Sequence, residues 1–260
     1  MTDFAASTLD VDLEGGALTV WLSRPDARNA ISLQMCDDLC RLFELLRFAS
    51  GIHIVILRGR GPSFCAGVDL KEFAGKDLPW MSRRRHRGLD AYLAIEQCPI
   101  PTLSVAHGAL IGGGCEIAAA CDFIFSLDTA FFRWPEAMRG GVGATQRLPR
   151  AVGRAMAKEL LFTGRTVSAA EAERIGLVNR VCVGTEALES AVGEAAAEIC
   201  RGSSACIRLI KQAMNNGENC DRTTAISIER QAIDHSLEVA QTLESHRQIL
   251  PWKNRADALR

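Results

Sequence analysis

Apolar and polar residues follow two different periods along this chain. Residues 9–13 alternate apolar and polar side chains, Gly15 and Gly16 offer a turn, and residues 17–23 resume an apolar run, which predicts a β-hairpin. Ser32 can cap a helix whose apolar positions recur with the helical period. Further strands are expected at residues 53–57, 102–106 and 122–126, and further helices after Asp69, through residues 89–95 and after residues 112–114. Short strands that alternate with helices indicate parallel pairing through crossover connections.

The pattern changes beyond Gly143, where most of the chain is amphipathic with a helical period. Helices are expected at residues 152–162, 168–175, 185–200, 204–214 and 223–243, and one strand at residues 178–183. Residues 75–81 show the least pattern and are expected to be mobile. We therefore predict an α/β fold whose mixed layer is followed by a helical C-terminal part, and the apolar faces of those helices favour self-association.

The composition narrows the class of protein. A chain of 260 residues with 48% hydrophobic side chains can bury a sizeable core, and its net charge of −1 gives no general attraction to nucleic acid or anionic lipid. No apolar run approaches the roughly 18 residues that span a bilayer. The first seven residues resemble neither a secretory signal nor a transit peptide. We expect a cytoplasmic protein with no membrane partner and no general affinity for nucleic acid.

Cysteines and arginines are the two residue types that could change this picture. The ten cysteines lie mostly in apolar runs, and no pair has the C-x-x-C spacing of a metal or redox site. We expect reduced thiols and no bound metal. Residues 83–87 hold four arginines and one histidine, which predicts a solvated helix face or loop; contact with a phosphate-bearing ligand or with nucleic acid is the alternative.

Three consecutive glycines, 112–114, stand between an apolar run and an Ala-rich segment that contains Glu116. Glycines let a ligand approach backbone N–H groups closely, and a helix start carries unpaired donors. Residues 64–69 have a similar arrangement of small residues after a strand. If the fold brings the two segments together, the N–H groups of Ala66 and Gly113 could form an oxyanion hole. Two tight turns with helix caps are the alternative.

Two glutamates lie close to these turns in the sequence. Glu116 stands in a first helical turn and Glu136 follows Pro135, so each could simply complement a helix dipole. Beside an oxyanion hole, however, two carboxylates in different environments are typical of acid–base catalysis. Trp134, directly before Pro135, could narrow the pocket or pack in the core.

Several segments together resemble the enoyl-CoA hydratase/isomerase (crotonase) family. They are Arg24-Pro25 with Asn29-Ala30, residues 64–71, Gly108 with residues 111–118, Cys121-Asp122, Phe132 with Pro135-Glu136, and residues 145–148. The segments occur in the family's order and approximate spacing, and the resemblance extends from about residue 9 to residue 215. Residues 137–144 depart from the pattern, because this loop is shorter than the family's and lacks its proline.

The resemblance implies a crotonase-like spiral of repeated ββα turns over residues 1–200 and a C-terminal helical trimerisation region at residues 201–260. It implies a homotrimer or a dimer of trimers, an acyl-CoA substrate and no cofactor. The thioester oxygen would be held by the N–H groups of Ala66 and Gly113. Glu116 would activate water and Glu136 would exchange a proton at Cα, which favours an enoyl-CoA hydratase.

The same resemblance implies further contacts to the substrate. They are assigned to Arg24, Arg28, Ala30, Cys65, Ala66, Gly67, Val68, Asp69, Leu70, Gly112, Gly113 and Trp134. Lys253 or Arg255 in the C-terminal tail could reach a CoA phosphate, and His107 is expected to bond the backbone at a strand end. An isomerase, another acyl-CoA lyase or hydrolase, and a non-catalytic acyl-CoA- or RNA-binding protein are the alternatives.

Overall fold

The computed structural model describes residue 4 and residues 6–242 of the chain. It divides into two compact units, Met1–Arg201 and Gly202–Arg260, which are treated separately below. The tail with Lys253 and Arg255 lies outside the described residues.

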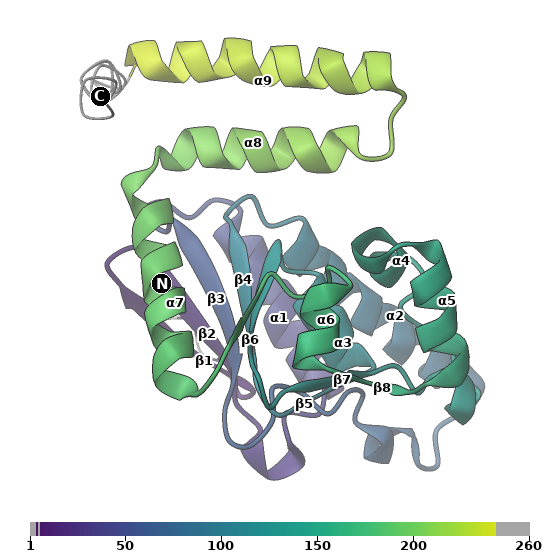
Figure 1. Ribbon diagram of the computed structural model, residues 1–260. Coiled ribbons are helices and arrows are strands. Elements are labelled where there is room, and N and C mark those ends of the chain that lie inside the picture. Colours follow the sequence, from purple (N-terminus) through teal and green to yellow (C-terminus); the bar gives the residue numbers. More distant parts are fainter. Residues whose placement is uncertain (1–3, 5, 243–260) are drawn as a thin grey trace. The chain divides into compact units, whose positions relative to one another are not determined.

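The first unit is built on a six-stranded sheet of order β1-β2-β3-β4-β6-β9 (Figure 1). Its strands are β1 Leu9–Glu14, β2 Ala17–Leu22, β3 Ile54–Gly59, β4 Thr102–Ala106, β6 Phe123–Leu127 and β9 Arg180–Cys182. Only β1 and β2 pair antiparallel, as the predicted hairpin; every later pairing in this sheet is parallel. The predicted α/β fold is confirmed.

A second, three-stranded sheet has the order β5-β7-β8. Its members are β5 Ala109–Ile111, β7 Phe131–Arg133 and β8 Thr166–Ser168. The sequence analysis missed all three, because a strand of three residues is too short to show a period. Along the chain, β4 of the large sheet is followed by β5 of the small sheet, and β6 is followed by β7. A strand in each sheet followed by a helix is the ββα turn of the spiral.

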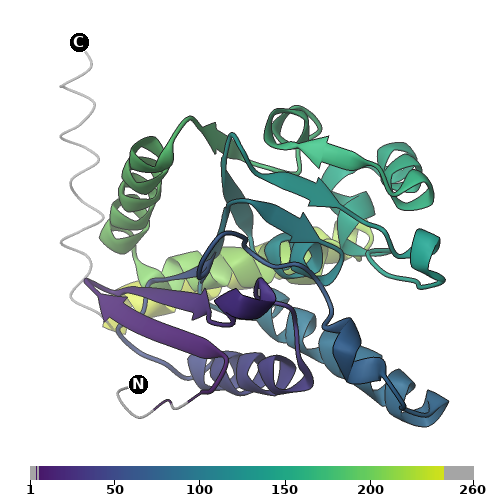
Figure 2. The same ribbon diagram turned by 90° about the horizontal axis from the view of Figure 1, so that it is seen from below.

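Helices cover both faces of the large sheet. The α-helices of the first unit are α1 Leu33–Leu46, α2 Leu78–Glu96, α3 Gly113–Ala119, α4 Arg147–Val152, α5 Arg154–Thr163, α6 Ala169–Arg174 and α7 Thr185–Arg201. Side chains alternate along β3: Ile54 and Ile56 join the core cluster that contains α7, whereas Val55 and Leu57 join the larger cluster that contains α1. Figures 1 and 2 show α1 and α7 on opposite faces of the sheet.

The start of α2 corrects one expectation. Residues 75–81 were expected to be mobile, but the helix begins at Leu78, and the side chain of Asp77 accepts a hydrogen bond from the N–H of Trp80 at 2.8 Å. Pro79 stands in the first turn, where a missing N–H costs nothing. Because α2 carries so many charged residues, its buried face shows little helical period in the sequence.

The second unit contains α8 Ser204–Gly217 and α9 Arg222–Thr242, which pack against each other. The side chain of Ser203 caps α8 by accepting a hydrogen bond from the N–H of Cys206. Both helices were predicted from their period. They keep apolar side chains exposed, among them Met214 and Leu237.

Candidate active site

The glycine turn brings backbone and carboxylate together. Gly112 has φ +51° and ψ −112°, a backbone conformation that residues other than glycine rarely adopt. A Cβ atom at this position would lie 2.5 Å from Oε1 of Glu136. The parallel pairing of Ile111 with Arg133 sets this approach, because it places the residues after β7 beside those after β5. Glycine is therefore required here by the backbone and by the neighbouring carboxylate.

The second loop of the site is extended and hydrogen-bonded to the residues before α1. The N–H of Ile31 donates to the carbonyl of Gly67 at 2.8 Å, and the N–H of Asp69 donates to the carbonyl of Ile31 at 3.0 Å. Both bonds lie on one side of the extended segment, so the N–H of Val68 between them points to the other side. Val68 lines the cavity described below.

The expected oxyanion donor in this loop is corrected. The N–H of Ala66 donates to the carbonyl of Arg28 at 2.9 Å, so it is not available to a ligand. The N–H groups of Val68 and Gly113 make no hydrogen bond to any described part of the chain. Free donors next to a cavity are what an anionic oxygen needs, and Val68 takes the place that the sequence analysis gave to Ala66.

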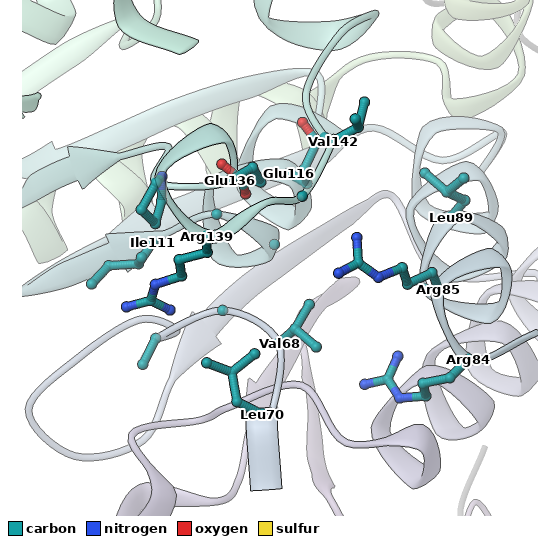
Figure 3. A pocket seen from close by; sticks show the side chains of 18 of the residues that line it. Val68, Leu70, Arg84, Arg85, Leu89, Ile111, Glu116, Glu136, Arg139 and Val142 are labelled. Carbon is teal, nitrogen blue, oxygen red and sulfur yellow. The ribbon is translucent and has the colours of Figure 1, made fainter. Parts of the chain in front are cut away.

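These two segments border a cavity of about 400 Å³. It is lined by Ala66, Gly67, Val68, Leu70, Phe73, Arg84, Arg85, Gly88, Leu89, Tyr92, Ile111, Gly112, Gly113, Glu116, Pro135, Glu136, Arg139, Gly141, Val142 and Gly143. Figure 3 shows the carboxylates of Glu116 and Glu136 on the same wall, across from Val68 and Leu70. The cavity therefore joins both candidate carboxylates to both free N–H groups.

Glu116 is buried and only partly paired. Its side chain accepts a hydrogen bond through Oε2 from Nη1 of Arg147 at 3.3 Å, whereas Oε1 is buried without a partner in the described structure. Burial raises the pKa of Glu116 to about 7, and the charge of Arg147 opposes that rise. Arg147 is itself shared, because its Nη2 lies 2.5 Å from Oε2 of Glu96. A carboxyl group with a pKa near neutrality is suited to proton transfer.

Glu136 stands at the start of the short 3-10 helix Ala137–Arg139. Its Oε2 atom is buried and has no hydrogen-bond partner among the described residues. Burial raises the pKa of Glu136, while a main-chain hydrogen bond and the positive charges of Arg139 and Arg85 oppose the rise. A Cβ on Gly143 would approach Cγ of Glu136 to 3.2 Å. The shortened loop thus folds around Glu136 and leaves its carboxylate in the cavity.

Several residues predicted to touch substrate do not line the cavity. Arg24 pairs with Asp69 at 3.0 Å, and the thiol of Cys65 donates to the carbonyl of Asn29 at 3.0 Å. The amide of Asn29 in turn donates to the carbonyls of Arg60 and Ser63, both at 2.8 Å. These residues hold the loop that contains Val68. Contacts from Arg24, Arg28, Ala30, Cys65 and Asp69 to the rest of a CoA molecule stay predictions.

Trp134 and His107 have structural surroundings. Trp134 is 1% exposed and belongs to the main hydrophobic core, and it does not line the cavity. Of the two predicted positions for the indole, the structure shows the packed one. His107 places Nε2 3.0 Å from the carbonyl oxygen of Gly61, as expected for a histidine that bonds the backbone at a strand end.

The arginine cluster of α2 is not a simple solvated face. Arg84 is 2% exposed, pairs with Glu72 at 2.9 Å and donates to the carbonyl of Ile31 at 2.5 Å. Arg87 pairs with Asp37 at 2.6 Å, and Arg85 points into the cavity (Figure 3). The expectation of a solvated face is wrong for Arg84, because a charged group can be buried when it is paired and hydrogen-bonded.

The sequence analysis named Arg147 only within a motif and gave Tyr92 no role. Both lie at the cavity or against its carboxylate, and the guanidinium of Arg147 stands 5.8 Å from the centre of the Tyr92 ring. Arg147 binds a carboxylate 31 positions away, which no local pattern reveals. In the sequence, Tyr92 stands out only because it is the one tyrosine of the chain.

Residues 4 and 6–242 contain neither a metal-binding cluster nor a membrane-spanning helix. No group of three His, Cys, Asp or Glu side chains there could hold a metal ion. None of the helices in this part of the chain is long and apolar enough to cross a membrane.

Comparisons with known proteins agree with one another. The family model described as enoyl-CoA hydratase/isomerase matches residues 12–250. The short-chain-enoyl-CoA hydratase of Clostridium acetobutylicum is 36% identical over 228 residues, which cover 85% of this chain and 86% of the relative. A crystal structure of enoyl-CoA hydratase from Bacillus anthracis has a TM-score of 0.87 and 31% identity, and the match covers 93% of this chain and 96% of that one. A Thermobifida fusca protein solved with acetoacetyl-CoA has a TM-score of 0.81 and 28% identity, over 91% of this chain and 97% of that one.

Proposed function

This chain belongs to the enoyl-CoA hydratase/isomerase family, and we propose that it adds water across the 2,3 double bond of a 2-enoyl-CoA thioester to give a 3-hydroxyacyl-CoA. The observation that carries the proposal is one cavity in which buried Glu116 and half-buried Glu136 meet two free N–H groups. The solved relative with acetoacetyl-CoA supports an acyl-CoA ligand.

The reaction follows from the charges that it creates. The oxygen of water attacks C3 while the carboxylate of Glu116 takes the proton of that water. The electrons of the double bond move onto the thioester oxygen, where the N–H groups of Val68 and Gly113 hold the developing negative charge. Protonated Glu136 then delivers a proton to C2, which restores the thioester. Atoms and charge balance with water as the only added reactant.

The raised pKa values of both glutamates support proton transfer in this cavity, and the positions of the two carboxylates carry the division of work. Glu116, with a pKa of about 7, exchanges protons readily near neutral pH. Burial raises the pKa of Glu136 as well, which keeps a proton on it to higher pH than on an exposed glutamate. The negative charge of Glu136 adds to the rise in the pKa of Glu116, so a proton on Glu136 favours the ionised form of Glu116 that hydration needs.

We also propose that residues 201–260 form the helical oligomerisation region of a homotrimer or a dimer of trimers. Exposed apolar side chains on α8 and α9, such as Met214 and Leu237, support it. A cytoplasmic location is proposed on the ten cysteines, all of which are free thiols, as expected in a reducing compartment.

A panel of 2-enoyl-CoA thioesters of increasing chain length tests the proposed reaction. Hydration predicts loss of the absorbance of the conjugated enoyl thioester, with a 3-hydroxyacyl-CoA identified by mass spectrometry. Glu116→Gln and Glu136→Gln should each lower kcat by about 100-fold or more. Wild-type rates in both variants would refute the roles of the glutamates. Formation of a 3-enoyl-CoA without hydration would refute the reaction and indicate isomerisation.

A further inference from the structure

Tyr92 is a buried polar residue of the cavity to which the proposed chemistry assigns no task. It is the only tyrosine of the chain, it is 5% exposed, and it projects from α2 into the cavity one helical turn after Gly88. Gly88 lies next to the phenol, and a Cβ there would be 3.8 Å from the phenol oxygen, an ordinary contact.

The phenol oxygen lies against the oxyanion loop. It is 2.5 Å from the place that a Cβ on Gly113 would occupy, so an alanine at that position would collide with it. Cγ2 of Val68 is 3.5 Å from the same point. The hydroxyl of Tyr92 therefore lies beside the two residues whose N–H groups are free to bind the substrate oxygen.

No hydrogen bond joins the hydroxyl of Tyr92 to another described residue. The phenol oxygen is not among the fully buried polar atoms that lack a partner, so it is open to the cavity. The side of the phenol that lines the cavity is where such a partner can bind. The hydroxyl is thus free to donate a hydrogen bond to a ligand in the cavity, next to Gly113.

We propose that the hydroxyl of Tyr92 is a third donor to the thioester oxygen of the bound acyl-CoA, alongside the N–H groups of Val68 and Gly113. This inference rests on the proposed function, since it assigns a substrate contact within the same site. A donor aimed at an oxygen that gains negative charge acts mainly in the transition state and therefore raises kcat.

The surroundings of the ring suit a donor of this kind. Burial raises the pKa of Tyr92 well above its usual value, so the phenol keeps its proton at neutral pH; the negative charge of Glu116 adds to the rise and the positive charge of Arg84 opposes it. The guanidinium of Arg147 faces the ring with its carbon 5.8 Å from the ring centre. The hydroxyl is therefore protonated, and the ring that carries it lies against a cation.

Tyr92→Phe removes only the hydroxyl and tests the proposal in the full chain. With crotonyl-CoA we expect kcat to fall by about 10-fold or more with little change in KM. Ser190→Ala, which removes an exposed hydroxyl of α7, is the control and should keep wild-type kcat. Circular dichroism and thermal melting establish that both variants are folded.

A spectral readout separates contact with the thioester from other roles. The absorption band of dimethylaminocinnamoyl-CoA moves to longer wavelength when its carbonyl is polarised, and this shift should be smaller in Tyr92→Phe than in the wild type and in Ser190→Ala. An unchanged kcat with an unchanged shift overturns the proposal. So does a lower kcat with an unchanged shift, because the hydroxyl would then act on water or on Glu116.

The wild-type protein offers a test that needs no substitution. Because Tyr92 is the only tyrosine, the tyrosine doublet of the ultraviolet Raman spectrum reports on this hydroxyl alone. Binding of butyryl-CoA should move the doublet toward the ratio of a hydrogen-bond donor, and an unchanged ratio in the saturated complex overturns the proposal. If the doublet responds but no enoyl-CoA of the panel is hydrated, the contact stands and the proposed function fails.

Discussion

Replacing Arg147 by Gln should move the acid limb of the activity profile to higher pH. The guanidinium lies 3.3 Å from Oε2 of Glu116, and its charge opposes the effect of burial on that carboxyl group. At an effective dielectric constant of about 20, two unit charges at this distance attract by about 5 kcal/mol. Because Glu96 shares the guanidinium, we expect a smaller effect, a rise in the pKa of Glu116 of about 1 to 3.

The consequence for the rate is worked from the pKa of about 7 for Glu116. The base must be ionised to take a proton from water, so kcat/KM falls as the pH drops below that pKa. A rise of about 2 leaves about one molecule in a hundred ionised at pH 7 instead of half, which lowers kcat/KM there by about 50-fold. Raising the pH should restore part of the loss, up to the pH at which Glu136 loses its proton.

Glu96→Gln is the matched variant, and it is expected to shift the pKa of Glu116 in the opposite direction. The negative charge of Glu96 raises the pKa of Glu116, and its loss leaves Arg147 to a single carboxylate. The acid limb should therefore move to lower pH. The assay is the pH profile of kcat/KM for crotonyl-CoA hydration, with thermal melting as a control for folding. The reasoning is refuted if both variants are folded and their acid limbs coincide with that of the wild type, or move in the same direction.

Three further substitutions test the surroundings of Glu136 and the packing of the nearby Trp134. Gly112→Ala places a Cβ 2.5 Å from Oε1 of Glu136 at a positive φ, so kcat should fall by about 10-fold or more and the melting temperature should drop; wild-type values of both would contradict the close approach. Arg139→Gln removes a positive charge that lowers the pKa of Glu136, so the alkaline limb of the pH profile should move to higher pH rather than stay or move down. Trp134→Ala should lower the free energy of unfolding in urea by about 3 to 5 kcal/mol, whereas altered chain-length preference at unchanged stability would place the indole in the acyl pocket.

Long periodic segments could be predicted from the sequence, and short ones could not. Strands such as β3 and helices such as α1 bury a regular series of side chains, so their periods are visible. The strands β5 and β7 have three residues each and no period, yet their pairing of Ile111 with Arg133 is what places Glu136 beside Gly112. The shortened loop after Glu136 therefore departs from the family pattern without removing the carboxylate, because the anchor precedes the loop.

The residue that supplies the oxyanion donor could not be predicted from the sequence either. In an extended segment successive N–H groups point to opposite sides, so which N–H group is free depends on which carbonyls the segment meets. Here the carbonyl of Arg28 takes the N–H of Ala66, and the carbonyl of Ile31 takes that of Asp69. Both acceptors come from residues far away in the sequence.

The same hydrogen bonds fix the direction of the Val68 N–H group while leaving it unpaired. Arg24 pairs with Asp69, the amide of Asn29 holds the carbonyls of Arg60 and Ser63, and the bridge from Ile31 clamps the residues on either side of Val68. A donor stabilises a developing charge without a cost at the moment of reaction only if its direction is fixed beforehand. The segment around Arg24 thus serves the chemistry by fixing a backbone direction, even though its side chains lie outside the cavity.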